Sequence, residues 1–242
     1  MREAKRLVVT EQLIREVVHE VAPVVSEATG WPLEIRALGH RVLPRDRGYE
    51  EVLLARIKGA GIDLGDAPKR GLLERLLEYV VEGTVLAAYE PSTSELLVVR
   101  ENVDDSNLDG LRLVVAHELV HRGQHVNHGE LFAQVDAAVR AAFEGFLPGG
   151  GGIRQAIEHL RSIQQIMSLL ESHALYVQEQ LRQTHLPGAI IESHFDLPGL
   201  LLRVFGKAKL AQYAAAVPEV AAASVRGEVE SLYAAAESAG SA

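Results

Sequence analysis

The segment LRLVVAHELVHRGQHVNH, residues 111–128, constrains the fold of this chain more than any other part. It carries four of the chain's ten histidines and one glutamate behind and within an apolar run. Burying Glu118 would be costly unless a metal ion or another partner compensates its charge. The segment therefore indicates either a metal site or a core helix that is rich in imidazole. The apolar positions that would bury the helix are Leu113, Val114, Val115, Leu119 and Val120.

The pentapeptide HELVH, residues 117–121, has the spacing of a helical metal site. Residues four apart lie one turn apart on one face of a helix, so His117 and His121 can bind one ion. Glu118 lies about 100° around the helix, where it can take a proton from a metal-bound water whose pKa the ion lowers to about 7. A motif this short also arises by chance, in about 4% of chains of this size, so its context matters. A predicted hairpin before it and a capped helix around it favour the metal site.

A catalytic zinc ion usually has three protein ligands and a water. In one common pattern the third ligand is a histidine six residues after the second ligand, and a glycine stands three residues after the second ligand. Asn127 and Gln124 occupy these positions, so the pattern fails. His125 and His128 lie too far along the helix, because His125 is about 6 Å further along the axis than His121. They are expected to be exposed or to orient a neighbouring group.

The other common arrangement takes a glutamate from a later helix. Glu171 lies at the edge of an apolar stripe in the segment QQIMSLLESHALYVQEQL. As a metal ligand its charge would be compensated; the alternative is a carboxylate that reaches solvent or pairs with an arginine such as Arg140. His173 lies about 200° from Glu171 and so faces away from it on the same helix. The stripe consists of Ile163, Ile166, Leu170, Ala174, Val177 and Leu181.

The N-terminal part, residues 1–104, is predicted to be α+β. Thr10 caps a helix that closes at Gly30 and that Pro23 kinks or splits. The segment TVLAAYEPSTSELLVVREN predicts a β-hairpin that turns at residues 91–94, directly before the metal helix. The remaining predicted elements of this part are a strand over 33–43 and helices over 50–62 and 69–82.

Residues 105–242 are predicted to form the helical part of the same single domain, 1–242, and to carry the metal site. Ser106, with Asp109 three residues later, predicts the start of a helix over 108–126. The Ala- and Ser-rich tail is expected to fray. Further helices are predicted over 131–143, 153–183, 200–216 and 217–238, with a break at the glycines of 149–152.

Composition excludes several classes of function. A net charge of −9 provides no basic excess to bind nucleic acid or an anionic membrane. The chain has no cysteine, which excludes disulfides, thiolate zinc sites and a cysteine nucleophile, so any metal must be held by nitrogen and oxygen. No signal peptide and no apolar run of membrane-spanning length is visible, so we expect a soluble, cytoplasmic protein.

The segments AHELVHRGQH (116–125), LLESHALYV (169–177) and LLLRVFGKAKLAQYAAAVPEV (200–220) follow one another along the chain. In this order they resemble three motifs of a zincin-like metallopeptidase family that was once catalogued as a domain of unknown function. Some members of that family are labelled coenzyme biosynthesis-associated proteins. The similarity covers about residues 85–220 and implies a zincin fold and peptidase activity without naming a substrate. Ser172 stands where the family has glycine, and His125 stands where it has an aromatic residue. The matching residues are His117, Glu118, His121 and Gln124, then Leu170, Glu171, His173 and Ala174, then Gly206, Lys209, Gln212 and Tyr213.

Spacing and resemblance agree on zinc held by His117, His121 and Glu171, with Glu118 as the general base. The expected reaction is attack of water on a peptide carbonyl, with an oxyanion that zinc and one side-chain donor stabilise. Two alternatives stay open: a metal-binding scaffold or regulatory protein that cuts nothing, and a hydrolase of small amides or esters. The oligomeric state is also open. Candidate donors are His173, Tyr176, His194 and Tyr213.

Overall fold

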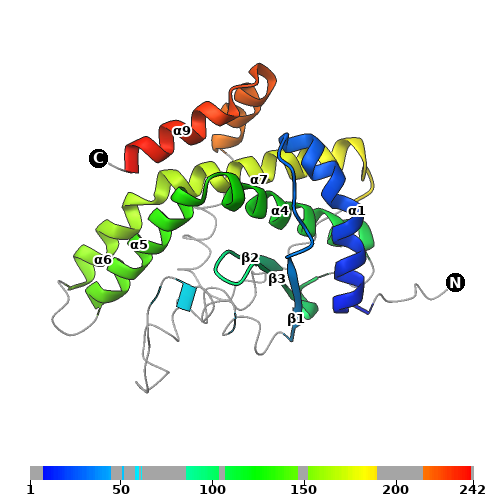
Figure 1. Cartoon of the computed structure of the whole chain (residues 1–242), viewed down its shortest axis with the longest axis horizontal. Helices are drawn as coiled ribbons and strands as arrows, with labels where there is room; N and C mark the ends of the chain where they lie inside the picture. Colours follow the sequence, from blue (N-terminus) through cyan, green and yellow to red (C-terminus); the bar gives the residue numbers. More distant parts are fainter. Residues whose placement is uncertain are drawn as a thin grey trace, which may run out of the picture.

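A computed structural model describes residues 8–44, 51, 58–59, 61, 86–103, 107–146, 152–189 and 215–240. These residues form an α+β structure that is mostly helical and contains one small sheet (Figure 1). Residues 215–226 are also helical. The elements are α1 (Glu11–Thr29), β1 (Gly39–Leu43), β2 (Ala87–Glu90), β3 (Glu95–Val99), the 3-10 turn η1 (Arg100–Asn102), α4 (Leu108–Asn127), α5 (Gly129–Phe146), α6 (Gly152–Ser162), α7 (Gln164–Thr184) and α9 (Val229–Gly240).

Helix α4 lies at the centre of the molecule (Figure 1). It contacts α7 along one side, α1 at its N-terminal part and the strand β2. A helix that is covered over most of its surface needs apolar residues around most of its circumference, and α4 has them. Six of its buried residues form one core with Ala174, Val177 and Leu181 of α7: Leu111, Leu113, Val115, Ala116, Leu119 and Val120.

The sheet has the strand order β1-β3-β2. Strands β2 and β3 form the predicted antiparallel hairpin, with Tyr89 opposite Leu96 and Glu90 opposite Glu95. Strand β1 runs parallel to β3, with Gly39 opposite Glu95. Strand β2 therefore has no neighbouring strand on its outer side among the described residues, and it contacts α4.

The first helix has the predicted ends. The side chain of Thr10 accepts a hydrogen bond from the backbone N–H of Leu13, and Gly30 adopts φ 74°, a conformation that suits glycine. The expectation that Pro23 splits the helix is wrong, because α1 is one element through that residue. The buried face that keeps it in place is Ile14, Val17, Val18, Val21, Ala22 and Val25.

Three other element predictions need correction. The strand predicted over 33–43 is confined to β1, and Glu34 instead accepts hydrogen bonds from Arg122 of α4 at its carbonyl oxygen. The helix predicted over 153–183 is two helices, α6 and α7, that meet at Ile163. Helix α4 begins after Asn107, whose side chain accepts from the N–H of Gly110 as its N-cap; the predicted cap Ser106 lies outside the described residues.

The helix predicted over 217–238 is divided into two, residues 215–226 and α9, and the predicted fraying of the tail is not tested past Gly240, because residues 241–242 lie outside the described residues. Helix α9 follows residues 215–226 after a turn at Gly227, where φ is 67°. Tyr233 of α9 is fully buried, in a second core with Trp31, Leu131, Phe132 and residues of α7. The helices predicted over 50–62, 69–82 and 200–216 lie almost entirely outside the described residues. Among the helices that are described, none has the length and apolar character needed to cross a membrane.

Candidate metal centre

Three side chains from α4 and α7 meet at one point. Nε2 of His117 lies 3.2 Å from Nε2 of His121 and 3.4 Å from Oε2 of Glu171. Nε2 of His121 lies 3.7 Å from Oε1 of Glu171. Two ligands of a tetrahedral zinc ion, each about 2.1 Å from it, are about 3.4 Å apart. The three groups thus have the spacing of three corners of a tetrahedron, and they could hold a metal ion.

The helix pair explains why these residues meet. His117 and His121 are one turn apart on the side of α4 that contacts α7. On α7, Leu170 directly before Glu171 and Ala174 one turn after it are buried in the two cores. Their burial holds the Glu171 carboxylate at the edge of the contact between α4 and α7. The predicted apolar stripe of this segment is confirmed, since all six of its residues are buried.

Two glutamines hold the other ring nitrogens. Nδ1 of His121 lies 2.7 Å from Oε1 of Gln124, and Nδ1 of His117 lies 3.2 Å from Oε1 of Gln178. An amide oxygen only accepts hydrogen bonds, so each imidazole carries its proton on Nδ1 and turns Nε2 toward the centre. This arrangement is typical of metal-binding histidines, whose second nitrogen is held by an acceptor that fixes the ring.

The charges in the centre are strongly coupled. Burial by itself would lower the pKa of His121, but the charge and hydrogen bonding of Glu171 raise it to about 9, with smaller contributions from Glu118 and Gln124. Burial would likewise raise the pKa of Glu171, but His121 and His117 hold it well below its usual range. Without a metal the site therefore contains an imidazolium and a carboxylate, and a bound cation would take the place of that proton.

Glu118 lies beside this cluster and does not belong to it. Its Oε2 accepts a hydrogen bond of 2.8 Å from the backbone N–H of Tyr89 in β2. The residue is 9% exposed, so this hydrogen bond compensates part of the cost of burying its carboxylate. The carboxylate thus connects the helix α4 with the edge strand of the sheet.

Solvent reaches the centre from one side. The side chains of His117, His121 and Glu171 are 16%, 14% and 25% exposed. A structural zinc site is closed by four protein ligands, whereas a catalytic site has three and keeps one position open. Three ligand groups on a partly exposed surface match the second type.

The structure describes two of the four side chains that were predicted as possible donors to an oxyanion, and both already have hydrogen-bond partners. His173 is buried, and its Nδ1 lies 2.9 Å from the hydroxyl of Tyr233. Burial, together with the charges of His121 and His128, lowers the pKa of His173 to about 4, so the ring is neutral. The hydroxyl of Tyr176 accepts a hydrogen bond from Gln180. The other two candidates, His194 and Tyr213, lie outside the described residues.

The two later histidines of α4 are held away from the cluster. Nδ1 of His125 lies 2.9 Å from the hydroxyl of Tyr89. His128 is buried, where exposure was one expectation, and it stacks on Tyr233 with ring centres 4.1 Å apart.

Glu171 pairs with the two candidate ligand histidines, His117 and His121. Arg140, which the sequence offered as an alternative partner of Glu171, lies against Gly61.

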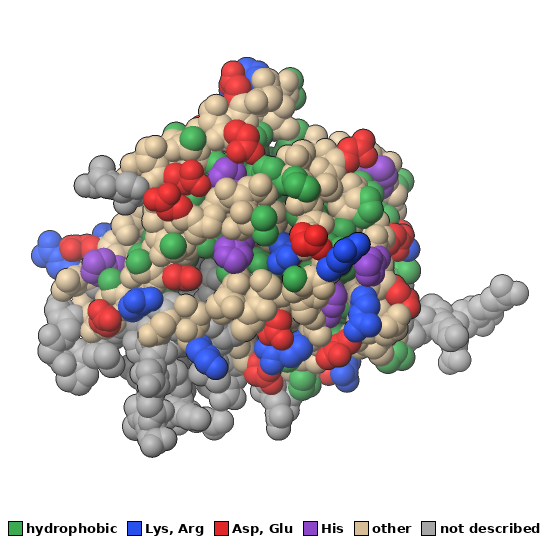
Figure 2. Space-filling model, in the orientation of Figure 1, with side chains coloured by type: hydrophobic (Ala, Val, Ile, Leu, Met, Phe, Trp, Pro, Cys, Tyr) green, Lys and Arg blue, Asp and Glu red, His purple; other side chains and the backbone are tan. Residues whose placement is uncertain are grey.

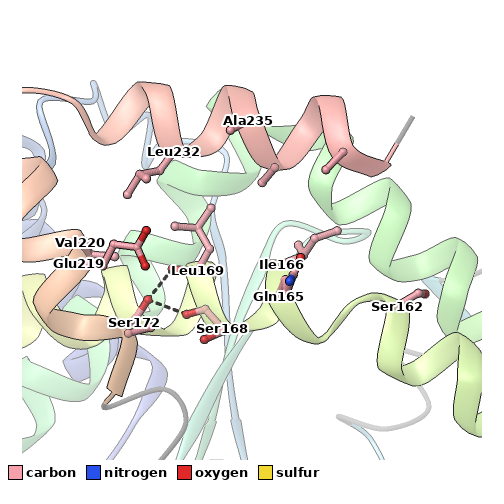
Figure 3. Close-up of a pocket in the computed structure, with 13 residues that line it drawn as sticks. Ser162, Gln165, Ile166, Ser168, Leu169, Ser172, Glu219, Val220, Leu232 and Ala235 are labelled. Atoms are coloured by element: carbon pink, nitrogen blue, oxygen red, sulfur yellow. Dashed lines mark hydrogen bonds between the residues drawn. The ribbon is translucent and has the colours of Figure 1, made fainter. Parts of the chain in front are cut away.

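A separate cavity of about 530 Å³ lies between α7, residues 215–226 and α9 (Figure 3). It contains none of the three candidate ligands. Ser172 lies at this cavity and donates its hydroxyl to the carbonyl oxygens of Ser168 and Leu169, so a side chain where the resemblance has glycine is accommodated within its own helix. On the surface shown in Figure 2, acidic and basic side chains of the described residues are interspersed.

Two residues that contact the side chains in and around this cluster escaped the sequence interpretation. Gln178 lies seven residues after Glu171, a spacing that places both on one face of α7, and this periodicity is the signal that could have found it. Tyr233 had no such signal, because it lies in an alanine-rich segment far from every motif.

Comparison with models of known protein families, with curated proteins and with solved structures found no match for this chain.

Proposed function

We propose that this protein is a zinc-dependent hydrolase of the zincin type that cleaves peptide or amide bonds. One observation carries the proposal: His117, His121 and Glu171 form an open three-ligand centre, with Glu118 beside it. The order of the three sequence motifs supports membership of the zincin-like metallopeptidase family. The described β-hairpin before the metal helix and the helices after it are compatible with that family.

The donor set suits zinc. Two neutral imidazoles and one carboxylate are the ligands of several catalytic zinc sites, and the absence of cysteine leaves nitrogen and oxygen as the only donors. With one carboxylate ligand, a divalent ion would leave the centre with a net positive charge. Such a charge favours an anionic fourth ligand and a developing oxyanion.

When bound, zinc would lower the pKa of a water molecule to about 7 and polarise the substrate carbonyl. Glu118 would take one proton from the attacking water at the carboxylate oxygen that does not bind Tyr89. The water oxygen forms a bond to the carbonyl carbon, and the carbon–nitrogen bond then breaks. Glu118 would deliver this proton to the leaving nitrogen and the remaining hydroxyl proton would follow, so the products would be a carboxylate and an ammonium group.

The edge strand β2 is a feature that favours an extended peptide as the substrate. The N–H of Val99 donates to the carbonyl of Leu86, and in an antiparallel ladder bonded pairs alternate with unbonded pairs. Ala87 and Tyr89 therefore point their backbone groups away from β3, toward the side of Glu118. A peptide could add to this edge through main-chain hydrogen bonds, which favours peptides over small esters.

Metal analysis combined with Glu118→Gln tests the proposal. The purified wild-type protein should contain one zinc ion and should cleave members of a broad peptide and ester library. Glu118→Gln should keep the zinc and lose turnover. Zinc without activity in either protein would favour the scaffold, and cleavage of small esters alone would favour the second alternative. No bound metal, and no rise in melting temperature on adding zinc, would refute the metal site itself.

A further inference from the structure

Tyr233 of the C-terminal helix α9 reaches two side chains next to the candidate metal centre, Gln124 and His173. It is fully buried although its helix is rich in alanine. Its hydroxyl lies 2.9 Å from Nε2 of Gln124 and 2.9 Å from Nδ1 of His173. Because the Gln124 amide can only donate through Nε2, the tyrosine oxygen accepts from it.

Gln124 is the junction between three helices. Its Oε1 accepts from Nδ1 of His121, and its Nε2 donates to the backbone carbonyl of Leu170 as well as to Tyr233. Leu170 immediately precedes Glu171. The amide is fully buried and each of its hydrogen-bonding positions has a partner, so its orientation depends on all three contacts.

Helix α9 is held at this junction by contacts on both sides of Tyr233. Glu230 accepts a hydrogen bond of 2.6 Å from Nε1 of Trp31, and Glu237 lies 3.1 Å from Nδ1 of His128. The ring of Trp31 meets that of Tyr233 edge to face, with centres 5.6 Å apart. These contacts place the tyrosine hydroxyl by packing that does not involve the metal ligands.

We infer that Tyr233 is a positioning residue of the metal centre: by fixing the amide of Gln124 it orients His121, and it couples the docking of α9 to metal binding. The inference rests on the proposed metal site. Because such coupling is reciprocal, a bound metal must also hold α9 more firmly in place.

The variant Tyr233→Phe separates positioning from packing. Phenylalanine keeps the stack on His128 and the edge contact with Trp31, but it removes the acceptor of the second N–H of Gln124. That N–H is then buried without a partner, and the amide is free to turn away from His121. Ser238→Ala is the matched control, since it also removes a hydroxyl from α9, one that is exposed and, among the described residues, bonds its own helix at Ala234.

The measurements are zinc affinity, from competition with a chromophoric chelator, and the visible absorption spectrum of the protein loaded with Co²⁺. Tyr233→Phe should bind zinc about threefold to tenfold more weakly than the wild type, and its cobalt bands should shift because the His121 ring is less constrained. Ser238→Ala should match the wild type in both. A Tyr233→Phe protein with wild-type affinity and an unchanged cobalt spectrum would overturn the inference.

A second measurement needs no variant. Hydrogen exchange of the wild-type amides over 229–240 should slow when zinc is added to the metal-free protein. Trp31 is the only tryptophan, so its fluorescence should change in the same titration. Equal exchange of α9 with and without bound zinc would contradict the coupling, even where Tyr233→Phe fails to fold. A wild-type protein that binds no metal at all would instead refute the proposed function.

Discussion

The backbone N–H of Tyr89 donates a hydrogen bond of 2.8 Å to Oε2 of Glu118, and this contact joins the edge of the sheet to the helix with the candidate metal ligands His117 and His121. One oxygen of the proposed base is therefore held by the fold, which fixes where the other oxygen can lie. The same contact aligns the outer edge of β2 with the metal centre, so the base and the surface proposed for the substrate are positioned together.

The hydrogen bond to Tyr89 makes substitutions of Glu118 unequal. Glu118→Gln should leave the free energy of unfolding nearly unchanged, because the amide oxygen still accepts from the backbone. Glu118→Ala should lower it by about 1–3 kcal/mol, since the N–H of Tyr89 is then buried without an acceptor. Denaturant unfolding in the presence of a chelator measures both, with the exposed Glu179→Ala as control. Equal stability of the two Glu118 variants would show that the bond contributes nothing.

Glu171→Gln should weaken zinc binding by more than the roughly 100-fold that the loss of a residue orienting a ligand can cost. The variant keeps the shape of the side chain and removes the charge that a cation requires. Glu179→Gln, on the exposed side of the same helix, should leave zinc affinity unchanged. Chelator competition and metal content answer the question together, and full zinc occupancy at wild-type affinity in Glu171→Gln would exclude this residue as a ligand.

Gln178 should be important for zinc binding by His117, whereas Gln183 on the same helix should not. Removing its amide oxygen in Gln178→Ala releases Nδ1 of His117 and should lower zinc affinity about 10-fold to 100-fold. Gln183→Ala is the matched control, because Gln183 is exposed on α7 and bonds only Glu179. Should both variants bind zinc equally, His117 is oriented by packing alone.

Zinc binding should release a proton from His121. Its pKa of about 9 in the metal-free protein means that the ring is protonated at pH 7, and a protonated nitrogen cannot bind a cation. From this residue alone, apparent affinity should rise about tenfold per pH unit from pH 7 until it levels near pH 9. Calorimetric titrations at pH 7 in buffers with different ionisation enthalpies count the protons, and release of none would show that His121 is neutral before zinc binds.

His173 should make the protein sensitive to acid. Its pKa is about 4 when folded, compared with a usual value of 6.5, because burial and the charges of His121 and His128 disfavour the protonated ring. The unfolded chain therefore takes up more protons, so this contribution to stability is complete above pH 6.5 and is lost as the pH falls toward 4. Between pH 7.5 and pH 5, the folding equilibrium constant of metal-free wild type should fall roughly tenfold to thirtyfold more than that of His173→Asn. Parallel pH profiles for the two proteins would contradict the assignment.

Local signals predicted much of the secondary structure. The cap residues Thr10 and Gly30 bound α1, and the turn at 91–94 separates the two strands of the hairpin. Both features depend on the conformational preferences of a few adjacent residues, which a sequence displays directly. The break at Ile163 and the short strand β1 were mispredicted, because tertiary contacts such as that of Arg122 with Glu34 compete there with local periodicity.

The sequence by itself determined the pairing of His117 with His121, because their spacing of four residues dictates one helix face wherever the helix lies. It also indicated Glu171, since a carboxylate at the edge of an apolar stripe needs a partner. Only the tertiary structure decided that Gln178 meets His117 and that Tyr233 meets Gln124. Hydrogen bonds between α4, α7 and α9 depend on how three helices pack, and no spacing within one segment specifies which side chain from another helix will meet it.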